Sequence, residues 1–199
     1  SDLQPDWLWV KNRDDSSTSH VIFDSSRGIN GDSDSLVLET SDDGAEGHDD
    51  DEHLKSFNSD GFTMQANSSR SNLDTKKYVA WQWKINAGTT SSDSNGDQTS
   101  TVQVNAAAGI SIALFAASNS AGQTVGHGLG SAPDMYIWKD RDRADNFYVY
   151  HRSLGAGKYL RLNTTAAAAS NANVWSDTDP SATLVYYGGN SLVGGDGNP

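Results

Sequence analysis

Short runs in which apolar and polar residues alternate constrain the fold of this chain more than any other feature of its sequence. Alternation has the period of a half-buried β-strand, whereas an amphipathic helix needs apolar residues every three or four positions. Ser, Thr, Asn, Asp and Gly, which favour turns, crowd the segments between the runs. About eleven strands are predicted on this basis, at residues 6–11, 20–24, 35–40, 61–65, 78–85, 100–104, 109–116, 134–139, 146–151, 158–163 and 183–187.

Helices are not expected, because no segment keeps a helical period over three turns. Residues 163–170, NTTAAAAS, have helical propensity but no apolar face, so we expect a loop or a single turn there. Many short strands separated by turns predict an all-β fold, an antiparallel β-sandwich of the jelly-roll type. The run at 78–85, YVAWQWKI, has few polar positions and is expected to be a central strand covered on both faces.

Composition excludes several classes of protein. The chain has 199 residues and a formal net charge of −12, which disfavours nucleic acid as a partner because the phosphate backbone is also negative. It contains no cysteine, which excludes disulfides and thiolate zinc sites. No apolar run approaches the length needed to cross a bilayer, so membrane insertion is not expected.

An internal repeat is the second organising feature. Residues 5–14, PDWLWVKNRD, are similar to residues 133–142, PDMYIWKDRD, and two further blocks follow in the same order. Those blocks align residues 20–28 with 147–155 and residues 35–40 with 159–164. We therefore predict two sequence-similar copies, a diverged and N-terminally incomplete one over 1–77 and a second over 78–199 that lacks its closing strand. Whether the copies pack as one sandwich is left open.

The densest charge lies in EGHDDDEHL, residues 46–54, where nitrogen and oxygen ligands suited to a metal are close together in the sequence. The candidate ligands are His48, Asp49, Asp51 and His53. The repeat alignment makes this stretch an insertion in the first copy, and adjacent acids repel one another and cannot all point inward. A solvated loop is therefore the favoured interpretation, and a metal site is the alternative.

A second candidate for metal binding is DSNGDQ, in which Asp93 and Asp97 give the spaced oxygens of a calcium turn. The twelve-residue calcium loop with its terminal glutamate is missing, and Asn95 and Gly96 are explained by an ordinary hairpin turn. We therefore predict no cofactor, with weak Ca²⁺ binding as the alternative.

Catalytic motifs are also missing. His127 lies among glycines and His151 follows a strand, and neither has the nucleophile or carboxylate pair in its motif that a general base would serve. A structural hydrogen bond is the expected role for both. The acids lie in turns or at strand ends rather than as a pair inside an apolar run, so glycosidase chemistry is not expected and the protein is predicted not to be an enzyme.

Aromatic side chains offer a different function, because an exposed ring can stack against a sugar. Most of them lie inside strand runs, where packing in the core is the default interpretation. The residues proposed for glycan or receptor contact are Trp138, Tyr148, Trp175 and Tyr186.

The segments YVAWQWK, TVGHGLGSAPDMYIWK and FYVYHRSLGAGKYLRLNTTAAAAS carry a resemblance. They are similar to a repeat of virion structural and tail-fibre-like proteins of marine phages, especially cyanophages, whose fold is thought to be concanavalin-like. The likeness covers residues 78–199, with residues 5–77 as a diverged copy, and residues 124–133 are its most specific part. Compared with that repeat, the chain is expected to start inside one unit and to stop before a closing strand.

The resemblance implies a non-enzymatic virion structural protein, such as a fibre, an appendage or a capsid-decoration subunit, located in the extracellular particle. Its expected partners are other virion subunits, including copies of itself, because a sandwich that lacks a strand has an unpaired edge. A host-surface glycan is a further expected partner. The alternatives are a carbohydrate-binding, lectin-like module and, less favoured, a glycan-degrading enzyme of the tailspike type.

Overall fold

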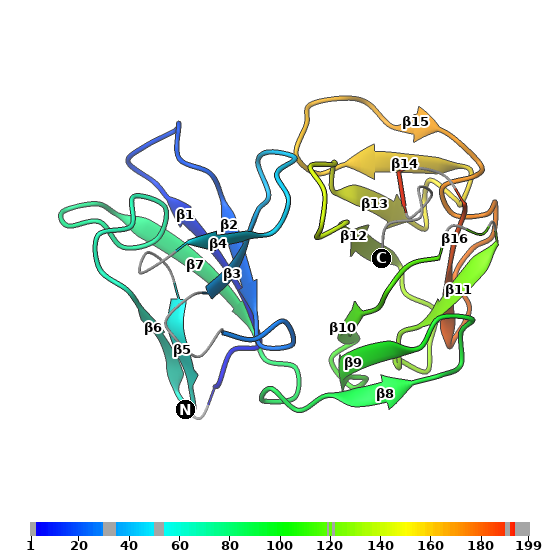
Figure 1. Ribbon diagram of the computed structural model, residues 1–199, viewed down its shortest axis with the longest axis horizontal. Helices are drawn as coiled ribbons and strands as arrows, with labels where there is room; N and C mark the ends of the chain where they lie inside the picture. Colours follow the sequence, from blue (N-terminus) through cyan, green and yellow to red (C-terminus); the bar gives the residue numbers. More distant parts are fainter. Residues whose placement is uncertain are drawn as a thin grey trace. The chain divides into compact units, whose positions relative to one another are not determined.

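The structure of the chain, a computed structural model, describes residues 3–29, 35–49, 54–118, 120, 122–189 and 192–193 (Figure 1). Over these residues the chain forms sixteen β-strands and no helix, which confirms the all-β prediction. Each of the predicted runs contains a strand, and residues 163–170 form a turn and a two-residue strand. Within the same residues no helix has the length and apolarity to cross a membrane. The chain divides into two compact units, Ser1–Thr89 and Thr90–Pro199, called unit 1 and unit 2 below.

Unit 1 contains a five-stranded antiparallel sheet in the order β4-β3-β2-β1-β7. The strands are β1 (Trp7–Asn12), β2 (Val21–Asp24), β3 (Ser35–Glu39), β4 (Gly47–Asp49) and β7 (Tyr78–Trp83). The predicted domain boundary after residue 77 differs from the division observed, because β7 pairs with β1 along its whole length and so completes unit 1. The central position predicted for β7 is corrected, since β7 ends the order of this sheet and Trp81 is 44% exposed.

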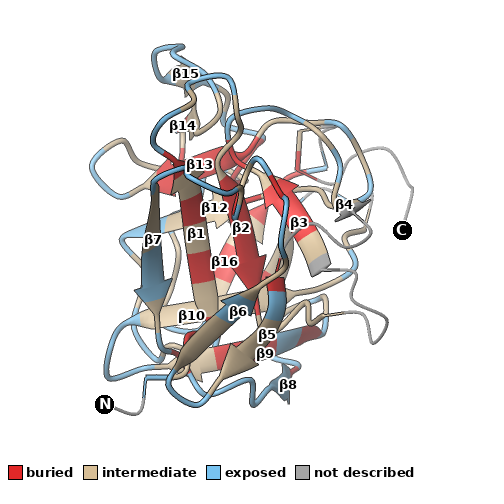
Figure 2. Cartoon of the chain, turned by 90° about the vertical axis from the view of Figure 1, so that its left-hand side faces the viewer, coloured by how far each residue is buried: buried red, intermediate tan, exposed pale blue. Residues whose placement is uncertain are grey.

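The core of unit 1 lies between one face of this sheet and a hairpin made of β5 (Leu54–Asn58) and β6 (Gly61–Met64). Alternate residues of β1 point into this core, and Figure 2 shows the resulting bands of buried residues along β1, whereas β2 is buried along its whole length. The buried residues are Leu8, Val10, Val21, Phe23, Val37 and Leu54, with Phe57, Phe62 and Met64 of the hairpin packed against them.

The carboxylate of Asp6 joins the start of β1 to the segment after β7. Its two oxygens accept hydrogen bonds from the backbone N–H groups of Ile85 (2.6 Å), Ala87 (2.9 Å) and Gly88 (2.7 Å), and from the hydroxyl of Ser25 (2.8 Å). Burial alone would raise the pKa of Asp6, but these hydrogen bonds stabilise the ionised form and lower the pKa below its ordinary value of 3.8.

A buried cation ties together β2 and the segment that precedes β4. The guanidinium of Arg27, whose side chain is 2% exposed, is paired with the carboxylate of Asp24 and lies 2.7 Å from that of Glu46. It also donates to the carbonyl of Ile22 at 3.2 Å. Burial alone would lower the pKa of Arg27, but the two carboxylates raise it, so the guanidinium stays charged.

Unit 2 contains three groups of strands. One sheet has the order β12-β13-β14-β15, a second β10-β9-β8, and β11 pairs with β16. The bounds are β8 (Ser91–Asp93), β9 (Ser100–Asn105), β10 (Ile110–Leu114), β11 (Gln123–Gly126), β12 (Met135–Trp138), β13 (Tyr148–His151), β14 (Lys158–Arg161), β15 (Ala169–Ser170) and β16 (Leu184–Tyr187). The core of this unit is aromatic and includes Trp138, Tyr148, Tyr150, Tyr159, Trp175 and Tyr187.

The two units each contain a four-stranded antiparallel meander, β1 to β4 in unit 1 and β12 to β15 in unit 2. Ile22 pairs with Leu38 in the first, and Val149 pairs with Leu160 in the second. If Ile22 is aligned with Val149, these registers make Leu38 the equivalent of Leu160. The third block of the predicted alignment instead matched Leu36 with Leu160, a difference of two residues. The connection before β4, residues 40–46, is as long as the connection before β15, residues 162–168. The predicted insertion that carries the acidic stretch stays a prediction, because residues 50–53 lie outside those that the structure describes.

Replacing Asp6 by asparagine is expected to destabilise unit 1 by about 2 kcal/mol at pH 7, because an amide nitrogen would face backbone N–H donors. The pKa of Asp6 is lower in the folded chain than in the unfolded chain. Asp6 therefore contributes its full stabilisation at pH values above the unfolded-state pKa, and this stabilisation is lost as the pH falls through the folded-state pKa. The difference in unfolding free energy between wild type and Asp6→Asn should therefore shrink below about pH 4 in denaturant titrations.

The matched control is Asp134→Asn, because the Asp134 side chain is 69% exposed and its carboxylate pairs with the exposed Arg152. It should change stability by less than about 0.5 kcal/mol. Equal losses in the two variants would contradict the role assigned to Asp6.

Candidate functional site

Four tryptophans occupy the face of the unit 1 sheet that points away from the hairpin. They are Trp7 and Trp9 on β1, and Trp81 and Trp83 on β7. Because successive residues of a strand point to opposite faces, the burial of Leu8 and Val10 in the core turns their neighbours Trp7 and Trp9 outward. The antiparallel register sets Trp7 opposite Trp83 and Trp9 opposite Trp81, which brings all four rings to one surface, called the tryptophan face below.

The rings of this face form a continuous cluster. The centroids of Trp7 and Trp83 are 4.5 Å apart, those of Trp7 and Trp9 are 6.0 Å apart, and those of Trp9 and Trp81 are 6.2 Å apart. Trp7, Trp9 and Trp83 are half-buried, and Trp81 is exposed. Aromatic rings joined in this way present a broad apolar surface whose indole N–H groups still need acceptors.

Two buried polar atoms lie beside this surface. Trp9 Nε1 and His20 Nδ1 are both buried, and within the described residues neither has a hydrogen-bond partner. The two rings lie edge to face with centroids 6.1 Å apart. A buried polar atom without a partner is costly, so the contacts of the described residues leave these two atoms unexplained.

Burial lowers the pKa of His20 below its ordinary value of 6.5, and the positive charge of Lys11 lowers it further. Lys11 lies on the same strand as Trp9, and its ammonium donates to the carbonyls of Asp15 (2.8 Å) and Thr18 (2.6 Å) in the loop between β1 and β2. The imidazole is therefore neutral at pH 7, and a neutral imidazole offers one donor and one acceptor to a ligand.

Three of the aromatic residues predicted to contact glycan lie in the core of unit 2. Trp138 is 8% exposed, Tyr148 is 1% exposed and Trp175 is completely buried. Trp175 also donates from Nε1 to the carbonyl of Lys158 at 3.0 Å. These three residues have no exposed ring face for a sugar, so the contact role predicted for them is corrected to core packing. Tyr186 is half-buried on β16 and its predicted role stays a prediction.

The structure does not describe the side chains of the metal ligands predicted at residues 48–53. His48 and Asp49 lie on β4, but the placement of their side chains is not described, and Asp51 and His53 lie outside the described residues. No group of three or more His, Asp or Glu side chains suited to a metal occurs among the residues that are described.

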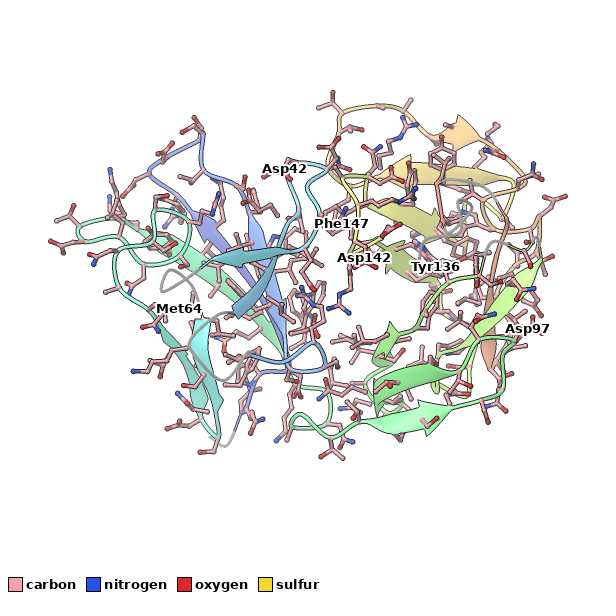
Figure 3. The ribbon with its side chains drawn as sticks, in the orientation of Figure 1. Asp42, Met64, Asp97, Tyr136, Asp142 and Phe147 are labelled. Carbon is pink, nitrogen blue, oxygen red and sulfur yellow. The ribbon has the colours of Figure 1, made fainter. Side chains whose placement is uncertain are left out.

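Asp93 and Asp97 have structural partners instead. The buried carboxylate of Asp93 accepts from the backbone N–H and the side-chain amide of Asn95 at 2.9 and 2.8 Å. Asp97 accepts from the backbone N–H and the hydroxyl of Thr124 at 3.1 and 2.8 Å, and Figure 3 shows its side chain at the periphery of unit 2, away from Tyr136. These contacts explain both acids as parts of a turn held against β11.

The structural roles predicted for two histidines are confirmed. His127 Nδ1 accepts from the backbone N–H of Leu129 at 3.2 Å, and its Nε2 lies 3.3 Å from the carbonyl of Ser181. His151 Nδ1 accepts from the backbone N–H of Ser153 at 3.2 Å. Each ring therefore stabilises a turn by accepting a hydrogen bond from a backbone N–H two residues further along the chain.

Sequence reasoning missed the tryptophan face, although a signal for it exists. The strands that form β1 and β7 both contain the pattern Trp-x-Trp, in WLW and WQW, so each strand places two tryptophans on one face. Only the pairing of β1 with β7, which are separated by most of unit 1, shows that the two pairs share a surface.

The described residues thus define an all-β protein with an aromatic sheet face. The chain belongs to the family described as a domain of unknown function, DUF7483, whose model matches residues 1–198. No curated protein and no solved structure matches the chain.

The His20 imidazole is expected to titrate with a midpoint below 6.5 in NMR spectra of its ring protons. The pKa of His20 is lower in the folded chain than in the unfolded chain. The stability linked to His20 is therefore present at pH values above the unfolded-state pKa and is lost as the pH falls through the folded-state pKa. In Lys11→Met the midpoint should rise but stay below 6.5, because burial has the larger effect. A midpoint at or above 6.5 in the wild type would show that the ring is not held in this environment.

Proposed function

We propose that the chain is a non-enzymatic module of a virion structural protein and that it contacts neutral glycan on a host surface through the tryptophan face. The observation that carries the proposal is the cluster of Trp7, Trp9, Trp81 and Trp83, in which Trp81 is exposed. A sugar ring has apolar faces that stack on indoles, and Trp81, which is 44% exposed, offers an indole face to it.

Charge supports a neutral glycan over an anionic one. The formal net charge of −12 gives an unfavourable long-range field for phosphate, sulfate or carboxylate groups. Lys11, a cation on the same strand as Trp7 and Trp9, has its ammonium bonded to backbone carbonyls. A neutral glycan needs no charge neutralisation and can use the apolar surface directly.

The non-enzymatic part of the proposal is supported by the roles of the carboxylates with described partners. Asp6, Asp93 and Asp97 accept from backbone N–H groups, and Asp24 is paired with Arg27. A glycosidase needs two acids held on opposite sides of one glycosidic bond, one of them with a raised pKa. The pKa of Asp6 is lowered, whereas the acid of a glycosidase pair needs a raised pKa.

We also propose that the two meanders are copies of one unit, as the sequence similarity predicts. In unit 1 the Lys11 ammonium donates to backbone carbonyls of the loop after β1, and in unit 2 the Lys139 ammonium donates to the carbonyls of Arg143 (3.0 Å) and Asp145 (2.7 Å) in the loop after β12. The backbone carbonyls of Asp6 and Asp134 accept from the residues that follow β2 and β13. The shared bonds support a duplicated module.

A jelly-roll sandwich and assembly with other virion subunits belong to the same proposal. The free edge of β7 supports assembly, because within the described residues β7 pairs on one side only and an unpaired edge can accept a strand from another chain. The virion itself is supported by the sequence resemblance to phage structural proteins.

Glycan binding can be tested with the double variant Trp81→Ala, Trp83→Ala. A glycan array probed with the wild-type chain should show binding to neutral glycans, and the double variant should lose about tenfold or more in affinity by calorimetry, because two stacking surfaces are removed. Binding should survive chelator, since no metal is required.

The matched control is Met135→Ala, which removes an apolar side chain that is 53% exposed in unit 2. It should leave affinity unchanged. A wild-type chain that binds no neutral glycan, or a double variant that binds as well as the wild type, would overturn the proposed contact surface.

Placement on a virion gives a separate expected result. Mass spectrometry of gradient-purified particles should detect this chain at a fixed ratio to the major capsid subunit, because a structural protein has a defined copy number. Detection only in the unassembled fraction would contradict the virion assignment and leave the glycan test unaffected.

A further inference from the structure

Unit 2 contains a cavity of about 400 Å³ that none of the roles above uses. It is bordered by the segment that follows β15 and by the end of β16, and it is lined by small residues together with the polar side chains of Asn173, Ser176 and Asp177. The residues that matter for its chemistry are Gly122, Ala172, Asn173, Ser176, Asp177 and Gly188. Its volume lies within the range of sites that bind small molecules.

The loop that forms one wall is anchored to the core. Val174 and Trp175 are completely buried, and the backbone N–H of Gly188 donates to the carbonyl of Val174 at 3.0 Å. A Cβ at Gly188 would lie 1.6 Å from the carbonyl oxygen of Asn173, so only glycine permits this approach. The wall is therefore held in place before any ligand arrives.

Two consecutive residues of this loop adopt a backbone conformation that favours glycine. Ser176 has φ +53° and Asp177 has φ +49°, and the backbone N–H of Asp177 donates to the carbonyl of Ala172 at 2.7 Å. Such strain is concentrated at functional sites because the surrounding structure must maintain it. Here it accompanies a buried Ser176 hydroxyl without a hydrogen-bond partner in the described residues.

The lining indicates the class of ligand. Asp177 and Asn173 are exposed and together offer carboxylate and amide groups, which suit vicinal hydroxyls because a carboxylate accepts from two donors and an amide both donates and accepts. The Asp177 charge repels an anion. A divalent cation would need several acidic ligands, and no group of three occurs among the described residues.

We propose that this cavity is a binding site for a small neutral saccharide, one or two sugar units long, with Asp177 and Asn173 bonding its hydroxyls. The inference takes its ligand class from the proposed glycan contact, but it assigns a second site that lies wholly in unit 2 and uses stereospecific hydrogen bonds instead of aromatic stacking.

The test uses the whole chain and a panel of glucose, galactose, mannose, N-acetylglucosamine, maltose and lactose, with binding measured by saturation-transfer NMR and calorimetry. Asp177→Asn keeps a side chain that tolerates positive φ and removes the charge, and Ala172→Leu keeps the charge and fills the cavity. Each variant should weaken binding of the preferred sugar about tenfold or more. Asp142→Asn, an exposed acid in another loop of unit 2 (Figure 3), is the control for charge and should bind like the wild type.

The double variant Trp81→Ala, Trp83→Ala separates this site from the tryptophan face. Binding that survives the tryptophan changes and is lost in Asp177→Asn and Ala172→Leu supports the cavity even if the proposed surface contact fails. Binding that depends on the tryptophans and is unchanged in both cavity variants overturns the inference and leaves the surface contact standing. A wild-type chain that binds no sugar in the panel, or that binds only Ca²⁺ at Asp177, also overturns it.

Discussion

The alternation of side chains along β1 is the constraint on which unit 1 depends. One strand supplies Leu8 and Val10 to the core and Trp7 and Trp9 to the opposite face, and it pairs with β2 on one side and β7 on the other. A shift of one residue in its register would exchange the two faces and bury indoles where the hairpin now packs. The core and the tryptophan face are therefore specified together.

Two buried charged groups fix the position of this strand and its neighbours. The Asp6 carboxylate joins the entry of β1 to the segment after β7, and the Arg27 guanidinium joins β2 to the segment before β4. Both groups bond to backbone atoms that would otherwise lack partners. Their main effect is therefore to fix the positions of these segments, and the net Coulomb energy contributes less. The bonds of Asp6 hold β7 in register with β1, and that register aligns the four tryptophans.

Local alternation made the strands predictable, and long-range pairing did not follow from it. The strands missed by sequence reasoning, β4, β5, β8, β11 and β15, are short or polar and carry little periodic signal. Trp138 and Tyr148 lie opposite each other on one face of the β12–β13 pair, and alternation in the sequence does not tell whether that face is covered. The tryptophan face was missed because it requires the pairing of β1 with β7, and the cavity of unit 2 requires the backbone angles of Ser176 and Asp177.

The lysines that hold the loops after β1 and β12 bond to main-chain oxygens of those loops. A carbonyl is present whatever the side chain, so this mode of anchoring places almost no demand on which amino acids the loops contain. Mutations can accumulate there while the strand ends stay where they are. The lysine contacts therefore fix where the main chain of each loop runs and leave the side chains at the bonded carbonyls open to substitution.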